Sequence, residues 1–207
     1  MALTVFAVAA TRAHRRDEYL QAARLAVDPD RVRLELALVP GMSIVDRVLP
    51  EIDVNGDGLI GSAEARTYSQ KLVSGLILEV DRRPIHLVMT DVQVSPLPSM
   101  RQGEGAISIT AVAALPNLDA GDHRLHYRNT HRSDISAYLA NALVPTSDHV
   151  TITSQERDVR QQDLVIAYRL NAALPARQVS WTATALGGVA LLALVLTVWL
   201  SARIWRV

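Results

Sequence analysis

"RVRLELALVPG", residues 31–41, is the stretch that decides the fold class of this chain. Even-numbered positions 32 to 38 are valine or leucine, and odd-numbered positions 31 to 35 are arginine or glutamate. Successive side chains of a β-strand point to opposite faces, so this alternation predicts a strand with one face in a core. Pro40-Gly41 then ends the strand.

Short apolar stretches bounded by turn residues continue along the chain, and each is typical of a β-strand. They are residues 76–80, 85–94, 105–115, 123–129, 149–156 and 163–171. Residues 81–84 are a plausible hairpin connection between the first two, while 133–143 fits either a short helix or an irregular edge strand. Strands at this spacing predict a mainly β protein, an antiparallel β-sandwich.

The helical part is confined to two stretches, "SIVDRVL" at 43–49 and "SAEARTYSQKLVSG" at 62–75. Ser62 is suited to cap the second helix and Gly75 to end it. Pro50 lacks a backbone N–H and disfavours helix before it, so the first helix should be short or kinked. We therefore expect a helix-loop-helix at about 43–74, inserted after the strand at 31–39.

Between these helices lies "DVNGDGLIGSAE", residues 53–64, which matches the EF-hand pattern D-x-[DN]-x-[DN]-G-x₅-E in full. Calcium prefers six to eight oxygen ligands, and Gly58 permits the sharp turn that such a loop needs. Gly61 leaves room for a water, and Ile60 can anchor the loop in the domain. The predicted ligands are the side chains of Asp53, Asn55 and Asp57, the backbone carbonyl of Leu59 and the bidentate carboxylate of Glu64.

One such loop occurs in the chain, whereas calcium sensors usually pair two. A sensor hand also needs two good helices to open a hydrophobic groove, and Pro50 weakens the first. Extracellular modules bind calcium with dissociation constants of about 0.1–1 mM. We therefore expect Ca²⁺ as a structural ion here.

The two ends of the chain predict its topology. Residues 1–13 resemble a signal peptide without its basic leader, with cleavage leaving His14 first. Residues 181–200 are free of charge and long enough, at about 1.5 Å per residue, to span a bilayer core of roughly 30 Å. These segments predict an extracytoplasmic β-domain at 14–175, a stalk at 176–180, one transmembrane helix at 181–200 and a cytoplasmic tail at 201–207.

Composition and motifs argue against several classes of function. Lys+Arg and Asp+Glu both number 21, which gives a net charge of +0, and a nucleic-acid-binding surface is usually basic. Without cysteine the chain has neither disulfides nor thiolate metal sites. No serine lies in a G-x-S-x-G turn, and no other catalytic group of side chains is apparent. We expect neither nucleic-acid binding nor an enzyme.

Histidines leave a second function open. A free N-terminal His14 would combine an α-amine with an imidazole, a chelate suited to copper or nickel. The alternative is therefore a periplasmic transition-metal chaperone or sensor, which mass spectrometry of the mature N-terminus would distinguish. His123 and His126 should point to opposite faces of their strand and not bind one metal together.

Residues 14–41 followed by 52–64 resemble the extracytoplasmic EF-hand domains of bacterial membrane proteins. Related segments precede the membrane core of NicO-type nickel/cobalt exporters and of HupE/UreJ-like proteins. The resemblance implies a single-pass protein of the bacterial inner membrane with a periplasmic main domain, accessory to a membrane system such as a metal transporter. Transport activity itself is not implied, because the chain lacks the multi-helix core.

Overall fold

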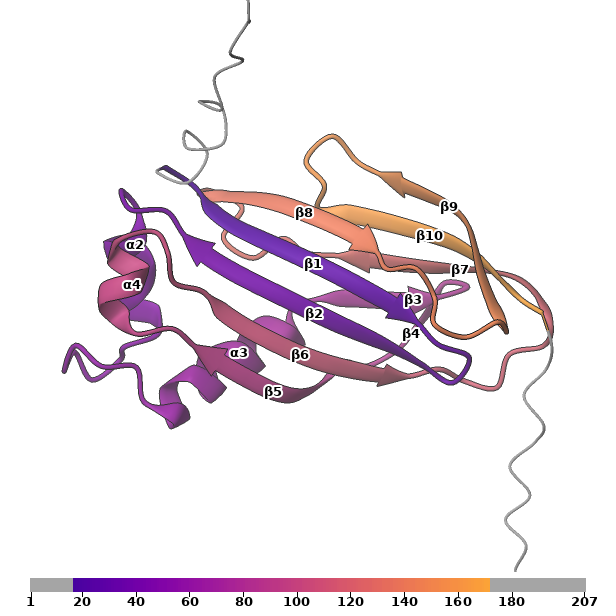
Figure 1. The fold of residues 1–207 in the computed structure, drawn as a ribbon, viewed down its shortest axis with the longest axis horizontal. Coiled ribbons are helices and arrows are strands. Elements are labelled where there is room, and N and C mark those ends of the chain that lie inside the picture. The colour runs from indigo at the N-terminus through magenta and orange to yellow at the C-terminus, as the bar shows by residue number, and fades with distance from the viewer. Residues whose placement is uncertain (1–16, 172–207) are drawn as a thin grey trace, which may run out of the picture. The chain divides into compact units, whose positions relative to one another are not determined.

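A computed structural model describes residues 17–171, which form two five-stranded β-sheets packed face to face (Figure 1). The β1 sheet has the order β5-β6-β2-β1-β8, and the β10 sheet has the order β4-β3-β7-β10-β9. The strands are β1 (Tyr19–Val27), β2 (Arg31–Pro40), β3 (Ile77–Val80), β4 (Arg83–Pro84), β5 (Val88–Val94), β6 (Ile107–Ala114), β7 (Gly121–Arg128), β8 (Ser136–Ala142), β9 (Val150–Arg157) and β10 (Asp163–Leu170). The prediction of a mainly β protein is confirmed.

The strand at 31–39 lies at the centre of the β1 sheet, as β2. The valine and leucine side chains at positions 32, 34, 36 and 38 are buried and the charged side chains are partly or fully exposed, as the alternation predicts. On one side it pairs with β1, whose register runs from Tyr19 opposite Pro40 to Val27 opposite Val32. Strand β1 was not predicted, because its apolar residues are not regularly spaced.

Two expectations about pairing need correction. Residues 85–94 were expected to form a hairpin with 76–80, but β3 pairs with the two-residue β4, and β5 crosses to the β1 sheet. The sandwich is also not wholly antiparallel, because β8 pairs in parallel with β1. Residues 133–143, left open between a helix and an edge strand, provide this edge strand β8.

The open edge of β8 is covered by side chains of β9. Arg157 Nε donates to the Ala140 carbonyl at 2.6 Å, and Gln155 Oε1 accepts from the Ala142 N–H at 3.0 Å. Unpaired strand edges can template association with other chains. These contacts therefore satisfy part of an exposed edge and join the two sheets.

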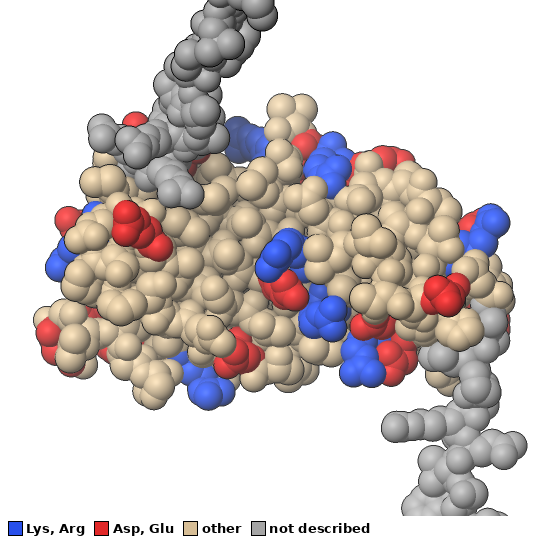
Figure 2. Space-filling model, viewed as in Figure 1, with Lys and Arg blue, Asp and Glu red and all other residues tan. Residues whose placement is uncertain are grey.

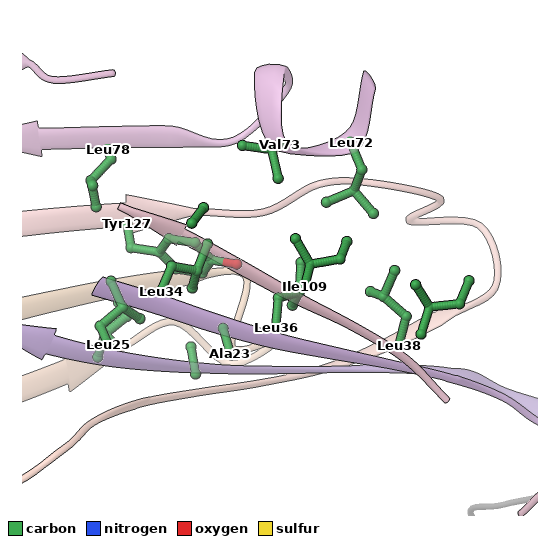
Figure 3. Close-up of a cluster of buried hydrophobic side chains, with 14 of the residues drawn as sticks. Ala23, Leu25, Leu34, Leu36, Leu38, Leu72, Val73, Leu78, Ile109 and Tyr127 are labelled. Carbon is green, nitrogen blue, oxygen red and sulfur yellow. The ribbon is translucent and has the colours of Figure 1, made fainter. Parts of the chain in front are cut away.

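The core lies between the sheets and extends under helix α3 (Ser62–Ser74). Figure 3 places Leu72 and Val73 of α3 and Leu78 of β3 opposite Leu34, Leu36 and Leu38 of β2. Helix α3 thus continues the layer of the β10 sheet and contacts β5. Burial of large aliphatic side chains contributes about 1.5–3 kcal/mol each, so α3 is part of the fold's stabilising core.

The remaining helices are short. Before the loop at 53–64 come α2 (Val45–Val48) and the 3₁₀ helix η1 (Leu49–Glu51), which confirms that Pro50 interrupts the first helix. Helix α4 (Leu97–Arg101) joins β5 to β6. Ser62 is the first residue of α3 and not its cap, because Gly61 occupies that position and donates its N–H to Glu64 Oε2 at 3.0 Å.

The outer face of the β1 sheet carries few charged side chains (Figure 2). Arg24 and Glu35, cross-strand neighbours on it, form an ion pair of 2.7 Å. Within residues 17–171 no helix is long and apolar enough to cross a membrane. The predicted signal peptide, His14, stalk, transmembrane helix 181–200 and tail lie outside the described residues.

Candidate metal site

The loop at 53–64 joins η1 to α3 at the end of the sandwich where β1 begins and β2 ends. Ile52, just before it, is fully buried, and Ile60 packs against the core as expected. Gly56 and Gly58 have φ angles of 70° and 79°. Glycine adopts this left-handed conformation without the steric cost of a side chain, so the turn predicted at Gly58 is present.

Side chains of the loop are held by its own backbone. Asp53 accepts the N–H of Gly56 at 2.9 Å and that of Gly58 at 3.0 Å, one on each carboxylate oxygen. Asn55 Oδ1 accepts the Asp57 N–H at 2.9 Å. These bonds hold the side chains of Asp53 and Asn55 against the backbone of the loop.

Asp57 continues the same pattern. Its Oδ1 accepts the Leu59 N–H at 2.8 Å, and its Oδ2 accepts from Asn55 Nδ2 at 2.9 Å. The side chain of Leu59 is exposed, so only its backbone takes part in the loop.

Glu64, in the first turn of α3, reaches back across the loop. Its Oε1 accepts the N–H groups of Val54 and Asn55 at 3.0 and 3.3 Å, and its Oε2 accepts that of Gly61. The twelfth position of the predicted loop is thereby bonded to the backbone of its second, third and ninth positions. In residues 17–171, however, no three His, Asp or Glu side chains form a group that could hold a metal ion.

A buried polar cluster that sequence reasoning missed lies one helical turn beyond Glu64. The Tyr68 hydroxyl is 2.9 Å from the Tyr19 hydroxyl and 3.0 Å from His131 Nε2. The His131 ring packs edge-on against both tyrosines. Burial raises the pKa of Tyr68 to about 12 and lowers the pKa of His131. A cavity of about 200 Å³ between Glu64 and His131 separates this cluster from the loop.

The segment that carries His131 is itself fixed by hydrogen bonds. The backbone carbonyl of His131 accepts hydrogen bonds from Gln21 Nε2 at 2.7 Å and from the Tyr138 hydroxyl at 2.8 Å. Arg132 pairs with Glu51 of η1 and with Asp134. The bonds from Gln21 to His131 and from Arg132 to Glu51 join residues far apart in the sequence, so no spacing pattern could have found them.

His123 and His126 point to opposite faces of β7, as predicted. His123 shares the inner face with the buried Leu125, whereas His126 lies outside, 2.7 Å from Asp163 Oδ1. On the inner face, His123 Nδ1 is 2.8 Å from Asp81 Oδ2 and Nε2 is 2.9 Å from the Asp119 carbonyl oxygen.

No protein-family model matches the chain, and no curated protein is detectably similar to it.

Proposed function

We propose that this chain is a calcium-binding, extracytoplasmic module whose loop 53–64 holds one structural Ca²⁺. The observation that carries the proposal is the set of side chains ordered over the loop backbone. A carboxylate has about four lone-pair sites, so Asp53 and Asp57 keep acceptor capacity after the bonds that they accept. The oxygen chemistry of Asp53, Asn55, Asp57, Leu59 and Glu64 fits a hard cation.

Calcium binding would change the partners of Glu64 above all. Its carboxylate now accepts three loop N–H groups, from Val54, Asn55 and Gly61. As a bidentate ligand it would exchange some of these for the ion, which would tie the loop to α3 more strongly than neutral N–H donors do.

A structural role is supported by the rigidity of the surroundings. The helical segments before the loop are four and three residues long, too short for the opening of a sensor hand. Helix α3 is packed into the core through Leu72 and Val73. A cation in this loop would therefore stiffen the link between η1 and α3 and leave the sandwich unchanged.

The proposed setting is a single-pass anchor at 181–200 in the bacterial inner membrane, beside a membrane system such as a metal transporter. Strand β10 ends at Leu170, paired with Gly121 and Val150, at the end of the sandwich opposite the loop. The module would act by binding and not as an enzyme.

The test is a thermal melt of the full-length chain in detergent, stripped with chelator and titrated separately with calcium, magnesium, nickel and copper. Calcium should raise Tm at about 0.1–1 mM, and at about 100 times the dissociation constant it should add about 2.7 kcal/mol. Glu64→Gln should abolish this rise. Asp46→Asn, an exposed acidic residue of α2, is the matched control and should retain it.

A Tm that does not respond to calcium would refute the proposal. Stabilisation by nickel or copper at about micromolar concentration, lost when His14 is replaced, would instead support the transition-metal alternative.

A further inference from the structure

We propose that His123 is a pH-operated clasp that holds both the β3–β4 turn and the segment before β7 against the sandwich when it is protonated, and releases one of the two when it loses a proton. The clasp lies at the end of the sandwich where β10 finishes, away from loop 53–64. It is independent of the proposed calcium site.

Both ring nitrogens of His123 face groups that can only accept a hydrogen bond. Nδ1 lies 2.8 Å from a carboxylate oxygen of Asp81, and Nε2 lies 2.9 Å from the backbone carbonyl of Asp119. A neutral imidazole has one N–H and can satisfy one of these acceptors, whereas the imidazolium has two and satisfies both. The geometry therefore matches the charged form.

The turn that the clasp holds is strained. Asp81 and Arg82 connect β3 to β4 with φ angles of 50° and 67°, a type I′ pattern that ordinarily uses asparagine and glycine. Asp81 offsets this strain by binding β7 at both oxygens, since Oδ1 accepts the Arg124 N–H at 2.9 Å and Oδ2 faces His123. The Asp81 N–H also donates to the Arg124 carbonyl at 2.9 Å. Loss of one proton leaves the ring a single N–H, so either the bond to Asp81 or the bond to the Asp119 carbonyl is lost.

The charges around His123 favour its protonated state. Burial alone would lower its pKa, but the bonds to Asp81 and to the Asp119 backbone, with both carboxylates nearby, raise it. Burial would likewise raise the pKa of Asp81, yet the bonds from His123 and the Arg124 N–H hold it below its ordinary value. The two shifts agree, as expected of an ion pair.

Neighbouring elements add charges of both signs. On β7, Asp122 is paired with Arg169 of β10 at 2.7 Å, which neutralises that side. Arg83 on the hairpin acts on Asp81. Tyr168 of β10 packs against the His123 ring with centroids 5.6 Å apart, within the range of a cation–π contact.

The sign of the pH dependence follows from the raised pKa. A group whose pKa is higher in the folded state contributes stability that is fully present below its unfolded value, about 6.5 for histidine, and is lost as the pH rises through the folded value. The clasp is therefore closed under mildly acidic conditions and opens on the alkaline side.

The first experiment is an NMR titration of the histidine ring nitrogens in the full-length chain in detergent micelles, with amide hydrogen exchange over the same pH range. We expect both nitrogens of His123 to remain protonated above the ordinary histidine range. Protection of residues 81–84 or of residues 115–121, corrected for intrinsic exchange, should fall several-fold as His123 deprotonates.

Asp81→Asn removes the charge of the carboxylate and keeps its shape, so it should lower the pKa of His123. The matched control is Asp163→Asn, which contacts His126 on the outer face and should leave the pKa of His123 unchanged. A singly protonated His123 ring at neutral pH would overturn the proposal, as would protection of the two segments that does not follow its titration. The wild-type titration decides even if Asp81→Asn does not fold.

Discussion

Tyr19 and Tyr68 share a hydrogen bond of 2.9 Å between their buried hydroxyls, across 49 residues of sequence. Tyr19 opens β1, and Tyr68 lies in α3 one turn after Glu64. The same Tyr68 hydroxyl contacts His131 Nε2. The exit helix of the candidate calcium loop is thus bonded to a strand of the sandwich and to the segment before β8.

Replacing Tyr68 with phenylalanine should destabilise the fold by about 1–3 kcal/mol, because the Tyr19 hydroxyl is left buried without its partner. The free energy of unfolding from urea titration measures this. In the double variant Tyr19→Phe/Tyr68→Phe both hydroxyls are absent, so the combined loss should be smaller than the sum of the single losses. Additive losses would contradict the coupling.

The same cluster makes stability depend on the charge of His131. If its Nε2 is unprotonated, Tyr19 can donate to Tyr68 and Tyr68 to His131, so every hydroxyl hydrogen has an acceptor. Protonation reverses this order and leaves the Tyr19 hydrogen without an acceptor in the cluster. Burial, with Arg132 and Lys71 opposing the carboxylates of Glu51 and Asp134, lowers the His131 pKa accordingly.

A lowered folded pKa means that the contribution of His131 is present above about pH 6.5 and is lost as the pH falls through the folded value. The unfolding free energy of the wild type should therefore fall more than that of His131→Gln between about pH 7.5 and about pH 5. Equal slopes for the two proteins would show that the ring does not titrate in the folded state. The pKa of His123 is raised, so its contribution to stability is lost as the pH rises and not as it falls. The pH dependence of His123→Gln should therefore differ from that of the wild type in the opposite sense.

Gly105→Ala should be costly because the added methyl has no room. A Cβ at Gly105 would lie 2.6 Å from the Met100 backbone nitrogen and 2.9 Å from its Cα, and Met100 is fully buried. We expect a loss of about 1–3 kcal/mol in the free energy of unfolding. Gly75→Ala is the control, because a Cβ there would lie 3.4 Å from the Leu72 carbonyl oxygen, an ordinary contact. It should change the free energy of unfolding by less than about 0.5 kcal/mol.

Periodicity in the sequence predicted those elements whose local pattern matches their environment. β2 is buried on one face along its whole length, so its pattern predicts a strand without ambiguity. The interruption at Pro50 was also predictable, because proline acts through its own ring and missing N–H. β1 was missed because its last residues, Leu25 to Val27, are all buried and break the alternation.

The tertiary structure alone decided which strands pair and which polar groups meet. Residues 85–94 leave the hairpin for the β1 sheet because β3 pairs with β7 on one side and with the short β4 on the other. Likewise, His123 with Asp81 and His131 with Tyr68 are separated by 42 and 63 residues. Such contacts depend on the packing of whole sheets, which no local spacing encodes. The proposed oxygen ligands of loop 53–64, by contrast, all lie within twelve residues, so the sequence alone was enough to propose them.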